Sequence, residues 1–235
     1  ISGWMPFSMV GSLKLGHHAS DSAGRSSGRS APVITATVSL MLIFFGFSTA
    51  ARLPSRPDLC FGLVAYRDRT DPFVLRSHDL THDLGAFQKV LDQLQADGGG
   101  DYPEAMSEAL HVTVHRLGWR GDGATRMVVL LADAPPQLGA DRPAYDEAML
   151  AALGKGIKVF SVGASGLDPQ GEFIQRQIAQ FTGGRFVFLT YKDAADPSSG
   201  PGTQTGHDVG QYSVQTLDKL IVRLVGDEIA KLARS

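Results

Sequence analysis

The 235-residue sequence contains a single cysteine, Cys60, and no asparagine. One cysteine cannot form an intramolecular disulfide, and it cannot build a Cys-cluster zinc module. Without asparagine, the chain carries no N-glycosylation sequon. Its formal net charge is −2, far from the basic excess that broad nucleic-acid binding needs. These absences exclude disulfide scaffolds, cysteine-based zinc modules and general nucleic-acid binders.

Acidic residues are almost missing from the first 50 positions, which hold Asp21 alone, three basic residues and ten serines. Beyond them the chain has ordinary globular patterning, and the whole is 43% hydrophobic and 20% charged, enough to build a core. We therefore expect residues 1–32 to be irregular or disordered, residues 33–50 to form a separate apolar segment, and residues 51–235 to form one folded domain.

Residues 33–50 allow four interpretations. Basic residues precede the segment and Ser48-Thr49-Ala50 offers small side chains for cleavage, as in a signal peptide. The segment is also of marginal length for a membrane anchor. It also suits a buried strand of a sheet, or it is a translation artefact or damaged terminus with no evolved role. A signal or anchor would place the protein outside the cytoplasm, and membrane contact is expected only for an anchor. Otherwise a cytoplasmic location follows.

Beyond Ala51, short apolar runs alternate with amphipathic segments, which indicates an α/β domain with a mostly parallel sheet flanked by helices. The expected strands are Leu59–Tyr66, Phe73–Asp79 (an antiparallel edge), Met127–Ala132, Ile157–Val162 and Arg185–Leu189. The expected helices are 83–96 with Asp83 as N-cap, 103–117, 144–153, 171–181 with Phe173, Ile174 and Ile178 inward, and 213–233. A loop is expected over Lys192–Gly210.

Motifs of nucleotide-binding and hydrolytic sites are missing. No G-x-G-x-x-G follows a strand, and no G-x-x-x-x-G-K-[ST] exists. Gly163-Ala-Ser-Gly166 misses the G-x-S-x-G nucleophile turn by one position. His111 and His115 lie four residues apart, but the intervening residues lack the glutamate of a zinc peptidase. We therefore expect no nucleophile–base pair and no enzymatic activity.

Two aspartates fall where an α/β sheet binds ligands, at the carboxyl ends of its strands. Asp133 ends a strand of apolar residues, and Asp101 follows three glycines. Two carboxylates at one edge suit Mg²⁺ or Ca²⁺ better than softer metals. Alternatively, Asp101 caps the following helix and Asp133 begins a turn.

Three segments together resemble the von Willebrand factor type A domain: Phe61–Asp68 (FGLVAYRD), Gly98–Glu104 (GGGDYPE) and Val128–Pro136 (VVLLADAPP). The resemblance covers about residues 51–191. It is nearest to the branch found in bacterial proteins, in hemicentin-like extracellular proteins and in alpha-kinase-linked versions. It implies a doubly wound, Rossmann-like sheet with a metal-ion-dependent adhesion site at its upper edge. Domains of this family mostly bind other proteins, through an acidic residue of the partner that completes the metal's coordination.

Carried over residue by residue, Asp133 is similar to the metal-binding aspartate of the third loop. Gly100 stands where the second loop usually has threonine, and Asp101 would substitute as a ligand. The resemblance also implies that Asp68, Gly100, Tyr102 and Glu104 lie in partner-binding loops.

The first metal loop of the family, D-x-[ST]-x-S, is missing. If Val38–Phe45 is the first, central strand, the segment Gly46–Ala50 that follows has hydroxyls but no carboxylate. Loss of that aspartate removes charge that offsets dehydration of a hard cation. We expect Val38–Phe45 to fill the first-strand position as a parallel strand, and Mg²⁺ or Ca²⁺ binding to be weak or lost. The alternatives are a metal-dependent hydrolase using Asp101 and Asp133, or a truncated copy without function.

Overall fold

The computed structural model describes residues 39–44, 59–67, 69, 71–94, 103–121, 124–163, 167–189, 191–193, 196–201, 212–213 and 217–232. The expectations for residues 1–32, and for residues 33–50 apart from 39–44, lie outside this part of the chain.

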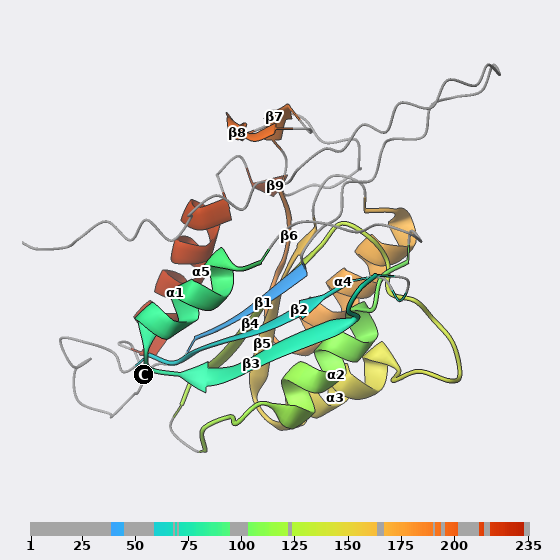
Figure 1. Ribbon diagram of the computed structural model, residues 1–235, viewed down its shortest axis with the longest axis horizontal. Coiled ribbons are helices and arrows are strands. Elements are labelled where there is room, and N and C mark those ends of the chain that lie inside the picture. The colour runs from blue at the N-terminus through green and yellow to red at the C-terminus, as the bar shows by residue number, and fades with distance from the viewer. Residues whose placement is uncertain are drawn as a thin grey trace, which may run out of the picture.

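A seven-stranded sheet forms the centre of the structure, in the order β3-β2-β1-β4-β5-β6-β9 (Figure 1). Its strands are β1 (Ser39–Phe44), β2 (Phe61–Tyr66), β3 (Leu75–Thr81), β4 (Arg126–Ala132), β5 (Ile157–Gly163), β6 (Phe186–Leu189) and β9 (Tyr212–Ser213). β2, β4 and β5 are almost completely buried, as their apolar runs predict. The protein is thus mixed α/β.

Only half of the sheet is parallel. β4, β5, β6 and β9 pair in parallel, whereas the pairs β3–β2, β2–β1 and β1–β4 are antiparallel. The antiparallel edge strand expected after the turn is present as β3. The expectation of a mostly parallel sheet is wrong for the half that contains β1.

β1 lies between β2 and β4, the position expected for it, but it runs antiparallel to both, with Leu40 opposite Ala65 and Met41 opposite Leu130. Parallel neighbours need a crossover of a dozen or more residues, usually containing a helix. The sequence between β1 and β2 contains Pro54 and Pro57, which disfavour such a helix. An antiparallel neighbour needs no crossover, and this accounts for the reversed direction.

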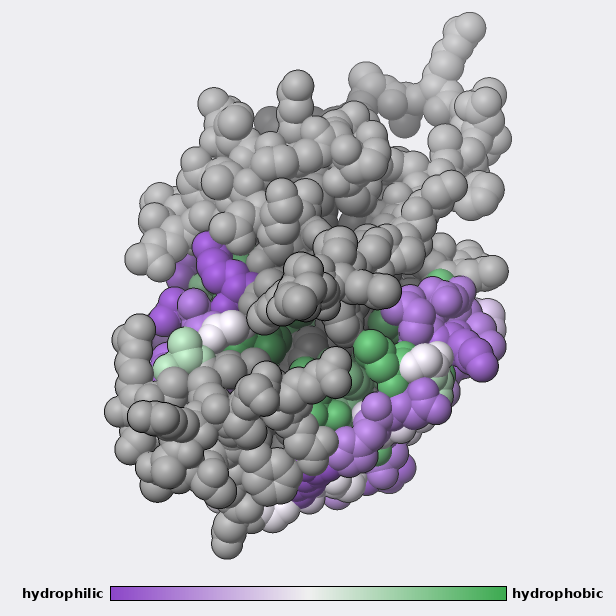
Figure 2. All heavy atoms as spheres, turned by 90° about the vertical axis from the view of Figure 1, so that its left-hand side faces the viewer, coloured by the Kyte–Doolittle hydropathy of each residue, from purple (hydrophilic) through white to green (hydrophobic). Residues whose placement is uncertain are grey.

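Helices pack against both faces of the sheet. α2 (Met106–Arg116), α3 (Tyr145–Gly154) and α4 (Pro169–Phe181) cover one face, and α1 (Leu84–Asp92) and α5 (Leu217–Leu232) cover the other (Figure 1). Two buried apolar clusters correspond to these faces. In Figure 2, apolar side chains are visible near the centre of the face, with polar side chains on either side of them. Asp83 caps α1 as expected, accepting a hydrogen bond from the backbone N–H of Ala86 at 2.9 Å.

Two local expectations are wrong. Phe173 is 64% exposed, because the buried stripe of α4 runs through Gly171, Ile174 and Ile178, and Phe173 lies about 100° around the helix from Ile174. The stretch expected as a loop from Lys192 contains part of a hairpin, β7 (Tyr191–Asp193) with β8 (Asp196–Pro201). Among the described residues, no helix is both long enough and apolar enough to span a bilayer.

The C-terminal helix is joined to the sheet by a buried ion pair. Glu228 of α5 is 2% exposed, and its carboxylate accepts a hydrogen bond from Lys158 of β5 at 2.6 Å and another from Lys231. Burial opposes ionisation of Glu228, but the two lysines outweigh it, so the pKa of Glu228 lies below its ordinary value.

We expect this pair to make stability depend on pH. A lowered folded-state pKa contributes stability above the unfolded-state pKa of about 4.3, and the contribution is lost as pH falls through the folded-state value. Glu228→Gln should lower the free energy of unfolding by about 1 kcal/mol at neutral pH, because solvent screens the partly exposed lysines. It should also flatten the pH dependence in acid. Urea unfolding across this pH range measures both effects.

The matched control is Glu172→Gln, which removes the more exposed pair with Arg176 within α4. Its expected cost is about 0.3–0.5 kcal/mol. Equal losses in the two variants at every pH would contradict a special contribution from Glu228.

Candidate functional site at the carboxyl edge of the sheet

β2 and β4 end at the same edge of the sheet, because both run antiparallel to β1 between them. Arg67 directly follows β2, and Asp133 directly follows β4. The backbone N–H of Ala105, just before α2, donates to the carbonyl of Arg67 at 3.4 Å. Three segments distant in sequence thus meet at this edge, after β2, before α2 and after β4.

The loop after β4 is fixed to the segment before α2 by backbone hydrogen bonds. The N–H of Glu104 donates to the carbonyl of Pro135, and the N–H of Gln137 donates to the carbonyl of Glu104, both at 2.9 Å. Glu104 and Pro136 form a parallel bridge. This pairing occupies the backbone of Glu104, so α2 begins at Met106 and not at Pro103 as expected.

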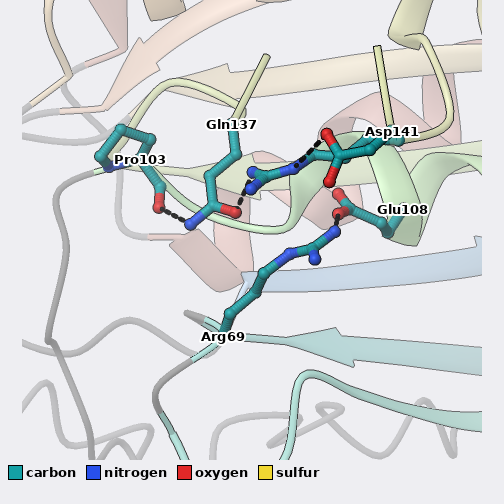
Figure 3. Close-up of polar contacts among 6 residues, drawn as sticks. Arg69, Pro103, Glu108, Gln137 and Asp141 are labelled. Carbon is teal, nitrogen blue, oxygen red and sulfur yellow. Dashed lines mark hydrogen bonds and ion pairs between the residues drawn. The ribbon is translucent and has the colours of Figure 1, made fainter. Parts of the chain in front are cut away.

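Gln137 reinforces the same junction through its side chain. Its Nε2 donates to the carbonyl of Pro103 at 2.9 Å, and its Oε1 accepts from Nη1 of Arg142 (Figure 3). Arg142 in turn lies beside Asp141, with Nε 3.6 Å from Oδ1. Both ends of the Gln137 amide are therefore used, which fixes the loop in place.

An ion pair links the segment after β2 to α2. Nη2 of Arg69 lies 2.8 Å from Oε1 of Glu108, which is 8% exposed. In Figure 3 the Arg69 side chain points toward Glu108, with Asp141 on the other side of the Glu108 carboxylate. The hydrogen bond to Glu108 raises the pKa of Arg69, burial opposes the rise, and the charges of Glu108 and Asp141 add to it. The edge therefore combines arginine and carboxylate groups.

The structure places two of the six residues predicted for the site. Asp133 is half-buried at the end of β4, as expected from the sequence. Glu104 is beside the β4 loop, with only 8% of its surface exposed. The other four lie outside the described residues, namely Asp68, Gly100, Asp101 and Tyr102.

The described residues do not by themselves suit Mg²⁺ or Ca²⁺. No group of three or more His, Cys, Asp or Glu side chains is near enough to hold a metal in this part of the chain. Such cations prefer six or more oxygen ligands, several of them anionic. The reversed direction of β1 adds to this, since its last residue, Phe44, pairs with Met127 at the opposite end of β4 from Asp133. β1 therefore ends at the edge of the sheet opposite Asp133, and not at the edge where the first metal loop was expected.

Sequence reasoning missed Arg69, Glu108, Gln137 and Arg142. One signal for Glu108 was available, because it lies between Ala105 and Val112 on the buried side of α2, where an acidic residue needs a partner. Nothing in the local sequence identifies Arg69 as that partner, since 39 positions separate the two.

No protein-family model matches the sequence, and no curated protein matches it. The resemblance to the von Willebrand factor type A domain therefore stays a prediction from the three quoted segments.

Proposed function

We propose that the chain is a protein-binding module of the von Willebrand factor type A kind, doubly wound and Rossmann-like, that acts without catalysis. Its partner is proposed to bind at the carboxyl edge of the sheet. The observation that supports this best is the meeting of three segments at Asp133, where the segment before α2 is hydrogen-bonded to the loop after β4. Ligands of α/β sheets bind at such edges.

The exposed guanidinium of Arg69 favours a partner that presents an acidic residue. Arg69 has 43% of its side chain exposed, so a partner's carboxylate can approach the guanidinium beside Glu108. Charge-assisted hydrogen bonds of this kind are among the stronger polar contacts in interfaces. The exposed carboxylate of Asp141 would compete with the partner's carboxylate for the arginine side chains at this edge. Recognition in this proposal is between protein groups alone, and salt should weaken it.

Selection of displayed peptides for binding to the full chain tests the proposal. We expect peptides containing Asp or Glu to be enriched, and we expect Arg69→Gln to weaken their binding about tenfold, the loss typical of a charge-assisted hydrogen bond. Asp133→Asn should strengthen their binding, because it removes a like charge from the edge. Fluorescence anisotropy measures the affinities. Titrations in Mg²⁺ and in a chelator then report whether a divalent cation contributes.

Asp227→Asn on the exposed side of α5 is the matched control, because it removes a similar charge from a different element. Circular dichroism confirms that each variant is folded. Peptides that bind all variants alike, or a selection that enriches none, would overturn the proposal.

A further inference from the structure

Three side chains with complementary chemistry meet at the opposite edge of the sheet, where β2 begins. Sγ of Cys60 lies 3.3 Å from Nε2 of His82, and Nη2 of Arg120 donates to the same sulfur at 3.3 Å. Arg120 also contacts the His82 ring. A nucleophile, a base and a permanent cation are thus within contact distance, although they come from three separate segments and the sequence alone indicated no such pair.

The pairing of β2 with β3 positions the thiol against the imidazole. Cys60 directly precedes β2 and His82 directly follows β3, and the first pair between these strands is Phe61 with Thr81. Cys60 is 3% exposed, whereas His82 faces solvent. The imidazole therefore connects the buried thiol to solvent.

Arg120 is held by contacts on either side of it. Nε of Arg126 donates to the carbonyl of Arg120 at 2.8 Å. The N–H of Gly118 donates to Oδ1 of Asp79 at 2.7 Å, and the indole N–H of Trp119 donates to the carbonyl of Thr113 at 2.7 Å. The segment that carries Arg120 is therefore already held in place when the thiol ionises. Its guanidinium lies beside the sulfur, and this positive charge favours the thiolate.

We propose that Cys60 is a reactive thiolate that small hydroperoxides oxidise to sulfenic acid. The sulfur attacks the terminal oxygen of the peroxide, an S–O bond forms and the O–O bond breaks. Sulfur loses two electrons, and the peroxide is reduced to an alkoxide or hydroxide. That leaving group takes a proton from water, so the products are Cys60 sulfenic acid and an alcohol or water. The burial of Cys60 restricts the reaction to small oxidants.

Because Cys60 is the only thiol of the chain, its ionisation can be followed in the full-length protein by the ultraviolet absorbance of the thiolate, with no reagent needed. We expect the midpoint of thiolate formation to lie at least about one pH unit lower in the native chain than in the same chain unfolded in urea. Arg120→Met should abolish most of this difference, and Arg120→Lys should restore part of it.

Hydrogen peroxide then tests the chemistry. We expect the native chain to gain the mass of one oxygen atom at neutral pH and to be trapped by a 1,3-dione, and Cys60→Ser to do neither. Arg120→Met and His82→Gln should slow the reaction about tenfold, as loss of thiolate predicts. Arg116→Met and His78→Gln change the same residue types outside the cluster and should leave the rate unchanged.

An ordinary buried cysteine gives the opposite results. Burial without a stabilising cation would put the native midpoint at or above the unfolded one, and peroxide would not react. Either finding, or a midpoint that Arg120→Met leaves unchanged, overturns the proposal. None of these outcomes depends on what binds at the Asp133 edge.

Discussion

Replacing Gly184 by alanine is expected to remove a large part of the stability of the fold. A Cβ atom at this position would lie 1.9 Å from the carbonyl oxygen of Val159 and 2.6 Å from its carbon. Both are backbone atoms of β5, so no side-chain rotation relieves the overlap. The turn that contains Gly184 would have to move away from β5, and the hydrogen bonds from Ser161 N–H to Arg185 and from Val159 N–H to Thr182 would stretch.

We expect Gly184→Ala to cost at least about 3 kcal/mol, in the range for severe overpacking, from a total of about 5–15 kcal/mol for a domain. Urea unfolding followed by circular dichroism measures the loss. Gly183→Ala is the control at the neighbouring residue. Gly183 has a φ of 72°, but its Cβ would meet nothing within 4 Å. It should cost only about 1–2 kcal/mol for the left-handed backbone. Equal losses in the two variants would show that the close approach to β5 is absent.

The local elements of the fold were predictable because their signals are local. The apolar runs of β2, β4 and β5 are stable only where they are buried, as in the middle of a sheet. Asp83 is a residue type typical of helix N-caps, and it indicates the start of α1. The close approach of Gly184 to β5 was not predictable, because the double glycine marks only a turn. The prediction that Phe173 is buried was wrong because an apolar residue next to a buried stripe gives the same sequence signal as one within it.

For the candidate site, the sequence indicated Asp133 because a carboxylate at the end of a buried strand must emerge at the sheet edge. It could not indicate the ion pair of Arg69 with Glu108, nor the group of Cys60, His82 and Arg120. Both depend on the register and order of strands, and such contacts between distant segments leave no pattern in a single sequence. The direction of β1 is the most consequential example.

The reversed direction of β1 predicts which cysteine pair will cross-link. In a Cys60→Ser background, Met127→Cys can be combined with Phe44→Cys or with Leu40→Cys. Phe44 is the residue opposite Met127 in the antiparallel register. Leu40 is four residues away along the strand, on the order of 13 Å, which is too far for a disulfide. We expect mild oxidation to join positions 44 and 127 in most chains and positions 40 and 127 in few.

The two double variants share the change at Met127, so any cost of that substitution is the same in both. Thiol titration in denaturant counts the bonds formed. Were β1 parallel, with Leu42 still opposite Val129, Leu40 would face Met127 and the two yields would be exchanged. That outcome would return the segment after β1 to the edge of Asp133, where its hydroxyl groups could join a metal site. The expected outcome instead places the end of β1 at the edge opposite Asp133, and the recognition proposed at Asp133 then involves the loops after β2 and β4 and the start of α2.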